Sequence, residues 1–147
     1  GQATCDPLLL LGIRYAFLST MVAFVSGMIM IVLQSRFLGS TGNFIVLHGL
    51  GFHALQTLPL TGWLLERVNG DEKRGRLLLH VGSLSWMVSI LVIGLQTLLG
   101  RTTFEWTLFP IIAAVALSIW LVIVIVAAWK FSITQWAGNA ERTVDSK

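Results

Sequence analysis

Four long apolar runs, separated by short polar segments, are the dominant pattern along the chain. They cover residues 15–33, 43–65, 77–99 and 108–129, and the first of them contains no charged residue. At about 1.5 Å of helical rise per residue, a run of about 20 residues matches a hydrocarbon core about 30 Å thick. Each run therefore predicts one membrane-spanning helix.

The polar segments between the runs are short, and they comprise residues 34–42, 66–76 and 100–107. Lipid offers backbone groups no hydrogen-bond partner, which favours helices over open strands. The sequence also lacks the roughly ten-residue alternating segments of a membrane β-barrel. Because such short connections make consecutive helices antiparallel, the predicted fold class is an all-α integral membrane protein, a four-helix antiparallel transmembrane bundle.

The two ends of the chain are more polar than its centre. Residues 8–13 are predicted to lie in the membrane interface, with Arg14 and Tyr15 anchored among the headgroups. Alternatively, the first span begins at Leu8 and Arg14 extends its charge to the interface or pairs inside the bundle. The polar end after the fourth span is expected to be irregular or interfacial. The predicted segments are an N-terminal interfacial segment at 1–13, the bundle at 14–131 and a polar C-terminal tail at 132–147.

Composition supports lipid as the main solvent. Hydrophobic residues make up 55% of the 147 residues and charged residues only 12%, against about 25% charged in a soluble domain. The mean hydropathy is +0.80. These values exclude a water-soluble globular protein, a disordered chain and a nucleic-acid binder, which needs a dense basic face. The single cysteine, Cys5, excludes a disulfide within the chain and a CxxC site.

The distribution of Lys and Arg predicts the orientation of the spans. With four spans, both termini and the middle loop share one side of the membrane. The opposite side carries Arg36 and Arg101, and the other eight of the ten Lys and Arg lie on the first side. Both termini are therefore predicted to be cytoplasmic, in an inner or plasma membrane of bacterial type. The basic residues on that side are Arg14, Arg67, Lys73, Arg74, Arg76, Lys130, Arg142 and Lys147.

Polar side chains recur near the middle of the predicted spans. In antiparallel helices joined by a short loop, two residues lie at equal depth when their residue numbers add up to a nearly constant value. This value is about 76, 141 and 207 for the first, second and third loop. Gln56 is then level with Thr20 and Ser85. Because polar groups are costly in lipid, we expect His53 and Gln56 to face the interior in a polar cluster, which serves as interhelical hydrogen bonding or as a ligand site. The face of the second span that carries this cluster holds Gly49, His53, Gln56 and Leu60.

Small residues and a proline shape the first two spans. Ser19, Ala23 and Gly27 repeat at intervals of four, a pattern that lets another helix approach closely. Pro59 is expected to bend the second span, because it removes a backbone donor and crowds the preceding turn. From the interior position predicted for Gln56, we expect Gln56→Leu to disturb packing. We expect His80→Ala to be mild, because His80 is predicted near the cytoplasmic surface.

The three histidines do not form an obvious metal site. His48 and His53 are five residues apart, which turns them about 140° around the helix and off a shared face. His80 is expected to bond Thr61 or headgroup water. His53 is level with Met87 and His48 with Met28, and a His–Met pair can ligate haem iron. The alternative is that these methionines only fill gaps in the packing.

Three functions remain open from the sequence. The first is a membrane subunit that binds a membrane-soluble redox cofactor, haem or quinone, for electron transfer. The second is a structural or accessory subunit without a cofactor, and the third is a small channel or carrier for a neutral solute. An enzyme is not predicted, because the sequence offers no nucleophile that is clearly supported by a base and a third catalytic group. The expected partners are the lipid bilayer and other membrane subunits or further copies of the chain. The candidate cofactor-binding residues are His53, Gln56, His48, Met87, Met28 and Ser85.

Overall fold

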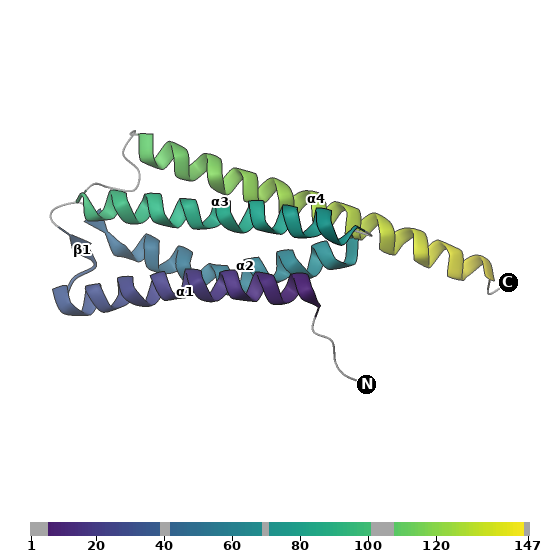
Figure 1. The fold of residues 1–147 in the computed structure, drawn as a ribbon, viewed down its shortest axis with the longest axis horizontal. Coiled ribbons are helices and arrows are strands. Elements are labelled where there is room, and N and C mark those ends of the chain that lie inside the picture. Colours follow the sequence, from purple (N-terminus) through teal and green to yellow (C-terminus); the bar gives the residue numbers. More distant parts are fainter. Residues whose placement is uncertain (1–5, 39–41, 69–70, 101–107, 146–147) are drawn as a thin grey trace.

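The protein is a bundle of four long helices (Figure 1). The computed structural model describes residues 6–38, 42–68, 71–100 and 108–145, and the side chains of residues 38 and 139–145 lie outside that description. Helices α1 and α2 are joined by a short antiparallel strand pair in which Phe37 lies opposite Asn43. In chain order the elements are α1 (Pro7–Leu33), β1 (Phe37–Leu38), β2 (Gly42–Asn43), α2 (Phe44–Val68), α3 (Glu72–Leu98) and α4 (Leu108–Asp145).

Three of the helices are long and apolar enough to cross a membrane: α1, α3 and the Leu108–Gly138 part of α4. The chain is therefore an all-helical protein of membrane type. Helix α2 does not belong to this set although it has 25 residues. Its two histidines, one glutamine and one proline are spread along its length, so no 18-residue stretch of α2 is as hydrophobic as the best stretches of the other three helices. The four predicted spans thus correspond to four helices, of which three are of membrane type by composition.

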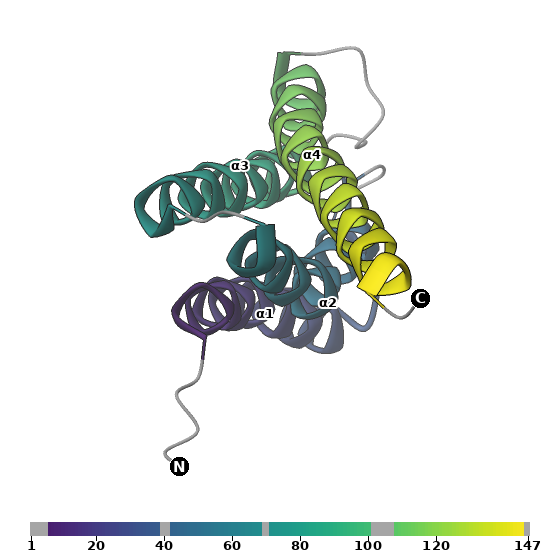
Figure 2. The same ribbon diagram turned by 90° about the vertical axis from the view of Figure 1, so that its right-hand side faces the viewer.

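The helices pack as two pairs. Helix α1 packs most extensively on α2, and α3 packs most extensively on α4, while α2 also contacts both α3 and α4. Viewed end-on, α1 and α4 lie on opposite sides of the bundle with α2 and α3 between them (Figure 2). Helix α2 therefore has one side against α1, another against α3 and α4, and a third that no helix of this chain covers.

Glycines bring α1 and α2 into backbone contact. A Cβ atom on Gly12 would lie 2.6 Å from the carbonyl oxygen of Leu58, and one on Gly62 would lie 2.5 Å from that of Leu8. Gly51 is as close to Ala23 and Ser19, where a Cβ would meet Ala23 Cβ at 2.6 Å. The expected close approach along the Ser19–Ala23–Gly27 series is confirmed, and α2 is the helix that uses it.

The register of α1 against α2 differs from the prediction. Gly12 lies opposite Leu58 and Ser19 opposite Gly51. The residue numbers of each pair add up to about six less than the expected value of about 76. The cause is the connection, because Gln34 adopts a left-handed φ of 50° and the strand pair then folds back along the end of α1. Helix α2 consequently begins beside the last turns of α1 rather than level with Leu33.

The other two registers agree with the prediction. Gly94 of α3 lies against Leu47 of α2, so their numbers sum to the expected value near 141. Trp86 of α3 makes an edge-on contact with Trp120 of α4, at a ring distance of 4.9 Å, close to the expected sum of about 207. In these two cases a symmetric estimate of the turn is adequate.

Both ends of the chain are more helical than predicted. Helix α1 begins at Pro7, with proline in its first turn, so residues 8–13 belong to the same continuous helix as the first predicted span. Helix α4 continues to Asp145 and extends past the start of α3 (Figure 1). Of the two expectations for the end of the chain, an irregular tail is wrong, because α4 stays helical to Asp145, and an interfacial position stays a prediction.

Candidate functional site

The predicted interior cluster around His53 and Gln56 is not in the interior. Both side chains are exposed, as is Leu60 on the same face of α2. The three residues do share one face, so that prediction is confirmed, but the face points away from α1, α3 and α4. The physical reason is that the small residues Gly51 and Gly62 allow a closer helix contact, and they turn toward α1 instead.

Most other polar side chains near this depth donate their hydrogen bonds within their own helix. Thr20 Oγ1 donates to the carbonyl of Ala16, and Ser118 Oγ donates to that of Ala114. Ser85 and Met87 are half-buried on α3, and within the described part of the chain no hydrogen bond joins either one to His53 or Gln56. Ser89 is the serine that reaches across, because its Oγ donates to the carbonyl of Ala113 on α4 at 3.2 Å.

His48 has the best-defined surroundings of the candidate residues. Its Nδ1 lies 2.8 Å from the carbonyl oxygen of Ala23 on α1, and 3.5 Å from Ser26 Oγ, which itself donates to the same carbonyl. A carbonyl oxygen can only accept a hydrogen bond, so Nδ1 carries the proton. In the neutral ring, Nε2 therefore has an unprotonated lone pair, the form in which histidine binds metal ions.

A pocket of about 590 Å³ opens beside His48 at the end of the α1–α2 pair. We call it the His48 pocket. Phe24 and Phe52 form part of its wall and make edge-on ring contacts, Phe24 with Phe52 at 5.3 Å and Phe52 with His48 at 4.8 Å. Met28, Ile31 and Arg36 also line the pocket. The structure thus brings two predicted candidates, His48 and Met28, to one pocket.

The rim of the His48 pocket carries a positive charge. Arg36 lines the pocket from the segment between α1 and β1, and its guanidinium lies 4.9 Å from the ring centre of Phe37. Met28 is 66% exposed and lines the same opening. The pocket therefore combines apolar walls, one free imidazole nitrogen and one cation. Sequence reasoning missed Phe52 and Arg36, although Phe52 lies one helical turn from His48.

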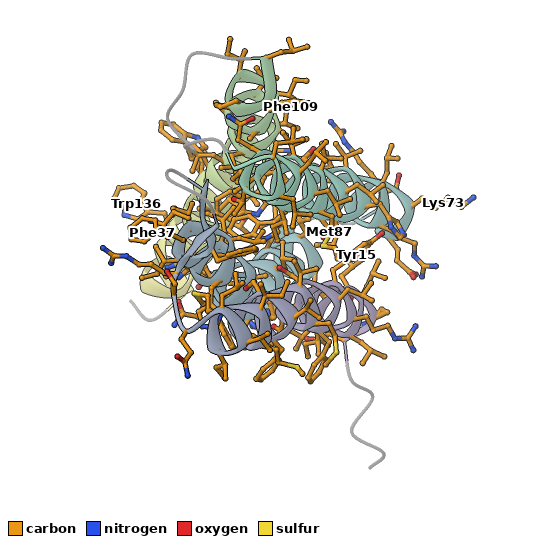
Figure 3. All side chains as sticks on the ribbon, turned by 90° about the vertical axis from the view of Figure 1, so that its left-hand side faces the viewer. Tyr15, Phe37, Lys73, Met87, Phe109 and Trp136 are labelled. Carbon is orange, nitrogen blue, oxygen red and sulfur yellow. The ribbon has the colours of Figure 1, made fainter. Side chains whose placement is uncertain are left out.

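His80 has a different partner from the one predicted. Its Nδ1 shares a 2.7 Å hydrogen bond with the hydroxyl of Tyr15, which ties α3 to α1. Thr61, the expected partner, donates to the carbonyl of Thr57 instead. Figure 3, which looks along the bundle, shows Tyr15 on the side where α1 faces α3. Tyr15 was expected to anchor in the headgroups, but it forms an interhelical contact.

Metal chemistry based on clustered acidic residues, cysteines or histidines has no basis in the described residues, where no three such side chains lie together. A site with one histidine and a thioether is of a different kind and does not require such a cluster. Comparisons with known proteins add nothing to this picture, because no family model, curated protein or solved structure matches the chain. The function must therefore be argued from the geometry of this chain.

Proposed function

We propose that the protein is a membrane-embedded electron-transfer subunit that holds a haem in the His48 pocket. One observation carries the proposal: the Ala23 carbonyl fixes the proton of His48 on Nδ1 and leaves Nε2 free for a metal. Histidines that bind metals in proteins almost always donate their other ring N–H to a carbonyl or carboxylate in this way. The proposal keeps the redox function expected from the sequence and transfers it from His53 to His48.

The proton position favours haem over quinone. A quinone carbonyl needs a hydrogen-bond donor, whereas Nε2 of neutral His48 is an acceptor. Iron in haem needs a lone pair, which Nε2 provides. When bound, haem supplies the one-electron chemistry of such a subunit, and this chain supplies the ligand and the surroundings.

The remainder of the pocket suits an amphipathic macrocycle. Phe24, Phe52 and Ile31 offer apolar surface, and Arg36 at the rim offers a cation for the carboxylate side groups of haem. Met28 lines the same pocket and would offer a thioether, a group that can ligate haem iron. A volume of about 590 Å³ falls within the range of about 300–1,000 Å³ typical of ligand pockets.

The packing of α2 supports a four-span topology. Because α2 packs along α1, α3 and α4, which are membrane-length apolar helices, it must lie at the same depth as they do. We infer four spans with both termini in the cytoplasm, from the Lys and Arg distribution. The His48 pocket, at the opposite end of the α1–α2 pair, then lies near the outer surface. Cys5, the single cysteine, reports the side of the N-terminus through its reaction with an impermeant maleimide in inverted vesicles but not in intact cells.

A subunit without a cofactor is the second candidate. It is favoured by the fact that His48 already makes a complete contact with α1, through Ala23 and the side of Gly27. In that function the pocket is only a gap at the lipid interface. The two candidates differ in whether His48 binds anything outside the chain.

The test is haem titration of the purified protein in detergent, with His48→Ala and His53→Ala as a matched pair on the same helix. We expect a Soret band at one haem per chain that His48→Ala abolishes and His53→Ala leaves unchanged. Free imidazole should restore the band in His48→Ala, which shows that a ligand was removed rather than the fold. Loss of the band in His53→Ala alone would return the site to the sequence-based location. No haem binding by the wild-type chain would favour the second candidate.

A further inference from the structure

The uncovered face of α2 is an unusual surface for a helix that lies within a membrane bundle. His53 and Gln56 are both exposed on it, one helical turn apart, and no hydrogen bond from either side chain is found among the described residues. Polar side chains that face acyl chains are costly and are rare in membrane proteins. These two therefore need a partner that lies outside this chain.

Gly49 gives a second, independent indication on the same face. A Cβ atom there would meet nothing within 4 Å, in contrast to Gly51 and Gly62 on the same helix, which α1 contacts closely. A glycine in a helix costs about 1 kcal/mol relative to alanine, and the fold of a single chain gives no reason for it here. Small residues in membrane helices mark positions where another helix approaches closely.

The spacing of these residues describes a helix–helix seam. Gly49, His53, Gln56 and Leu60 are separated by four, three and four residues, the alternation that places residues along one side of a helix pair. In such helix pairs a single buried amide fixes the register and the number of helices that associate. Gln56 occupies the equivalent place in this seam. We call the four residues the α2 seam.

We propose that the α2 seam is the interface with a second copy of this chain. Identical chains insert with the same orientation, so their two-fold axis is the membrane normal and the two α2 helices run parallel. Gln56 then faces the copy's Gln56, and His53 lies about 4.5 Å away in depth. An amide and an imidazole each have a donor and an acceptor, so the surface is complementary to itself.

The α2 seam is separate from the His48 pocket. His48 turns toward Ala23 on α1, whereas His53 turns away from α1. A dimer through the seam therefore leaves the pocket open, and it places two pockets on the same side of the membrane. The dimer does not depend on haem binding, and His48→Ala is expected to leave it intact.

Cysteine cross-linking in native membranes tests the contact directly. With Cys5 replaced by serine, Gln56→Cys should form a disulfide-linked dimer under mild oxidation. Leu84→Cys is the control, because Leu84 on α3 is 52% exposed and, from the α2–α3 register, lies at nearly the same depth. Equal cross-linking at both positions, or cross-linking of Gln56→Cys only to a different protein, would overturn the proposal.

Dimer fraction in liposomes gives the energetic test. Gly49→Leu and Gln56→Leu should each weaken association by about tenfold, measured by single-molecule photobleaching at a fixed protein-to-lipid ratio. Gln56→Asn should retain most of it, because the shorter amide still pairs. Gly49→Leu has open space around it in the single chain, so that a lost dimer with an intact fold supports the seam. A wild-type monomer at all protein densities would refute it.

Discussion

The two faces of α2 each carry a glycine, and the glycines differ in their surroundings although they are only two positions apart in the sequence. Gly51 lies against Ala23 and Ser19 so closely that a side chain has no room, whereas Gly49 faces open space. On the Gly51 face, contact is made by backbone and small side chains. On the Gly49 face the polar groups His53 and Gln56 are exposed. The comparison shows that the small residues, rather than the polar ones, decided which side of α2 turned toward the other helices.

The largest effect is expected from placing the same side chain at both glycines. Gly51→Leu must push α1 and α2 apart and break the 3.1 Å hydrogen bond from Ser19 Oγ to the Gly51 carbonyl, a loss of at least about 3 kcal/mol of unfolding free energy. Gly49→Leu should leave the single chain unchanged or slightly more stable. Steric-trapping unfolding in detergent micelles measures both. Equal destabilisation would remove the contrast between the two faces.

The Tyr15–His80 hydrogen bond is the next test, because it ties α1 to α3 away from both faces of α2. Tyr15→Phe leaves the half-buried His80 without its partner, at a cost of about 1–3 kcal/mol. His80→Ala should cost a similar amount, contrary to the mild effect expected from the sequence. The double variant should cost little more than either single one, and a purely additive double-mutant cycle would show that the bond does not form.

Much of the fold was predictable because lipid limits the choice. Four apolar runs of membrane length and three short connections left few arrangements, and the registers at Leu47–Gly94 and Trp86–Trp120 follow from the loops alone. The α1–α2 register did not follow, since the strand pair and the left-handed Gln34 make that connection asymmetric.

The candidate site was predictable only in part. His48 and Met28 were expected at one depth, and the structure places both at one pocket. The choice of His53 over His48 rested on the rule that polar groups face inward, which treats the chain as if it were alone in the membrane. A surface that associates with another chain breaks this rule. The hydrogen bond that sets the proton on His48 comes from the Ala23 carbonyl, and no side-chain pattern reveals a backbone group.

A smaller effect is expected at the junction between the end of α2 and the start of α1. The Glu66 carboxylate accepts a 2.8 Å hydrogen bond from the backbone N–H of Leu8, in the first turn of α1. A carboxylate at a helix N-terminus also interacts favourably with the helix dipole. Glu66→Gln retains an acceptor and loses the charge, so it should cost about 0.3–1 kcal/mol. Hydrogen exchange at the first amides of α1 should rise in this variant and stay unchanged in the rest of the bundle.

The smallest effect is expected for Gln56→Leu in the single chain, and it sharpens the comparison most. If Gln56 pointed inward, the substitution would orphan polar partners and destabilise the fold. Because the side chain is exposed and bonds no described residue, the unfolding free energy of the monomer should change by less than about 0.5 kcal/mol. The measurement is made in dilute detergent, where the chain is a monomer and its α2 seam has no partner. His80→Ala in the same micelles is the reference for a contact inside the bundle. A loss at Gln56→Leu as large as that of His80→Ala would mean that the outer face of α2 is packed within the chain.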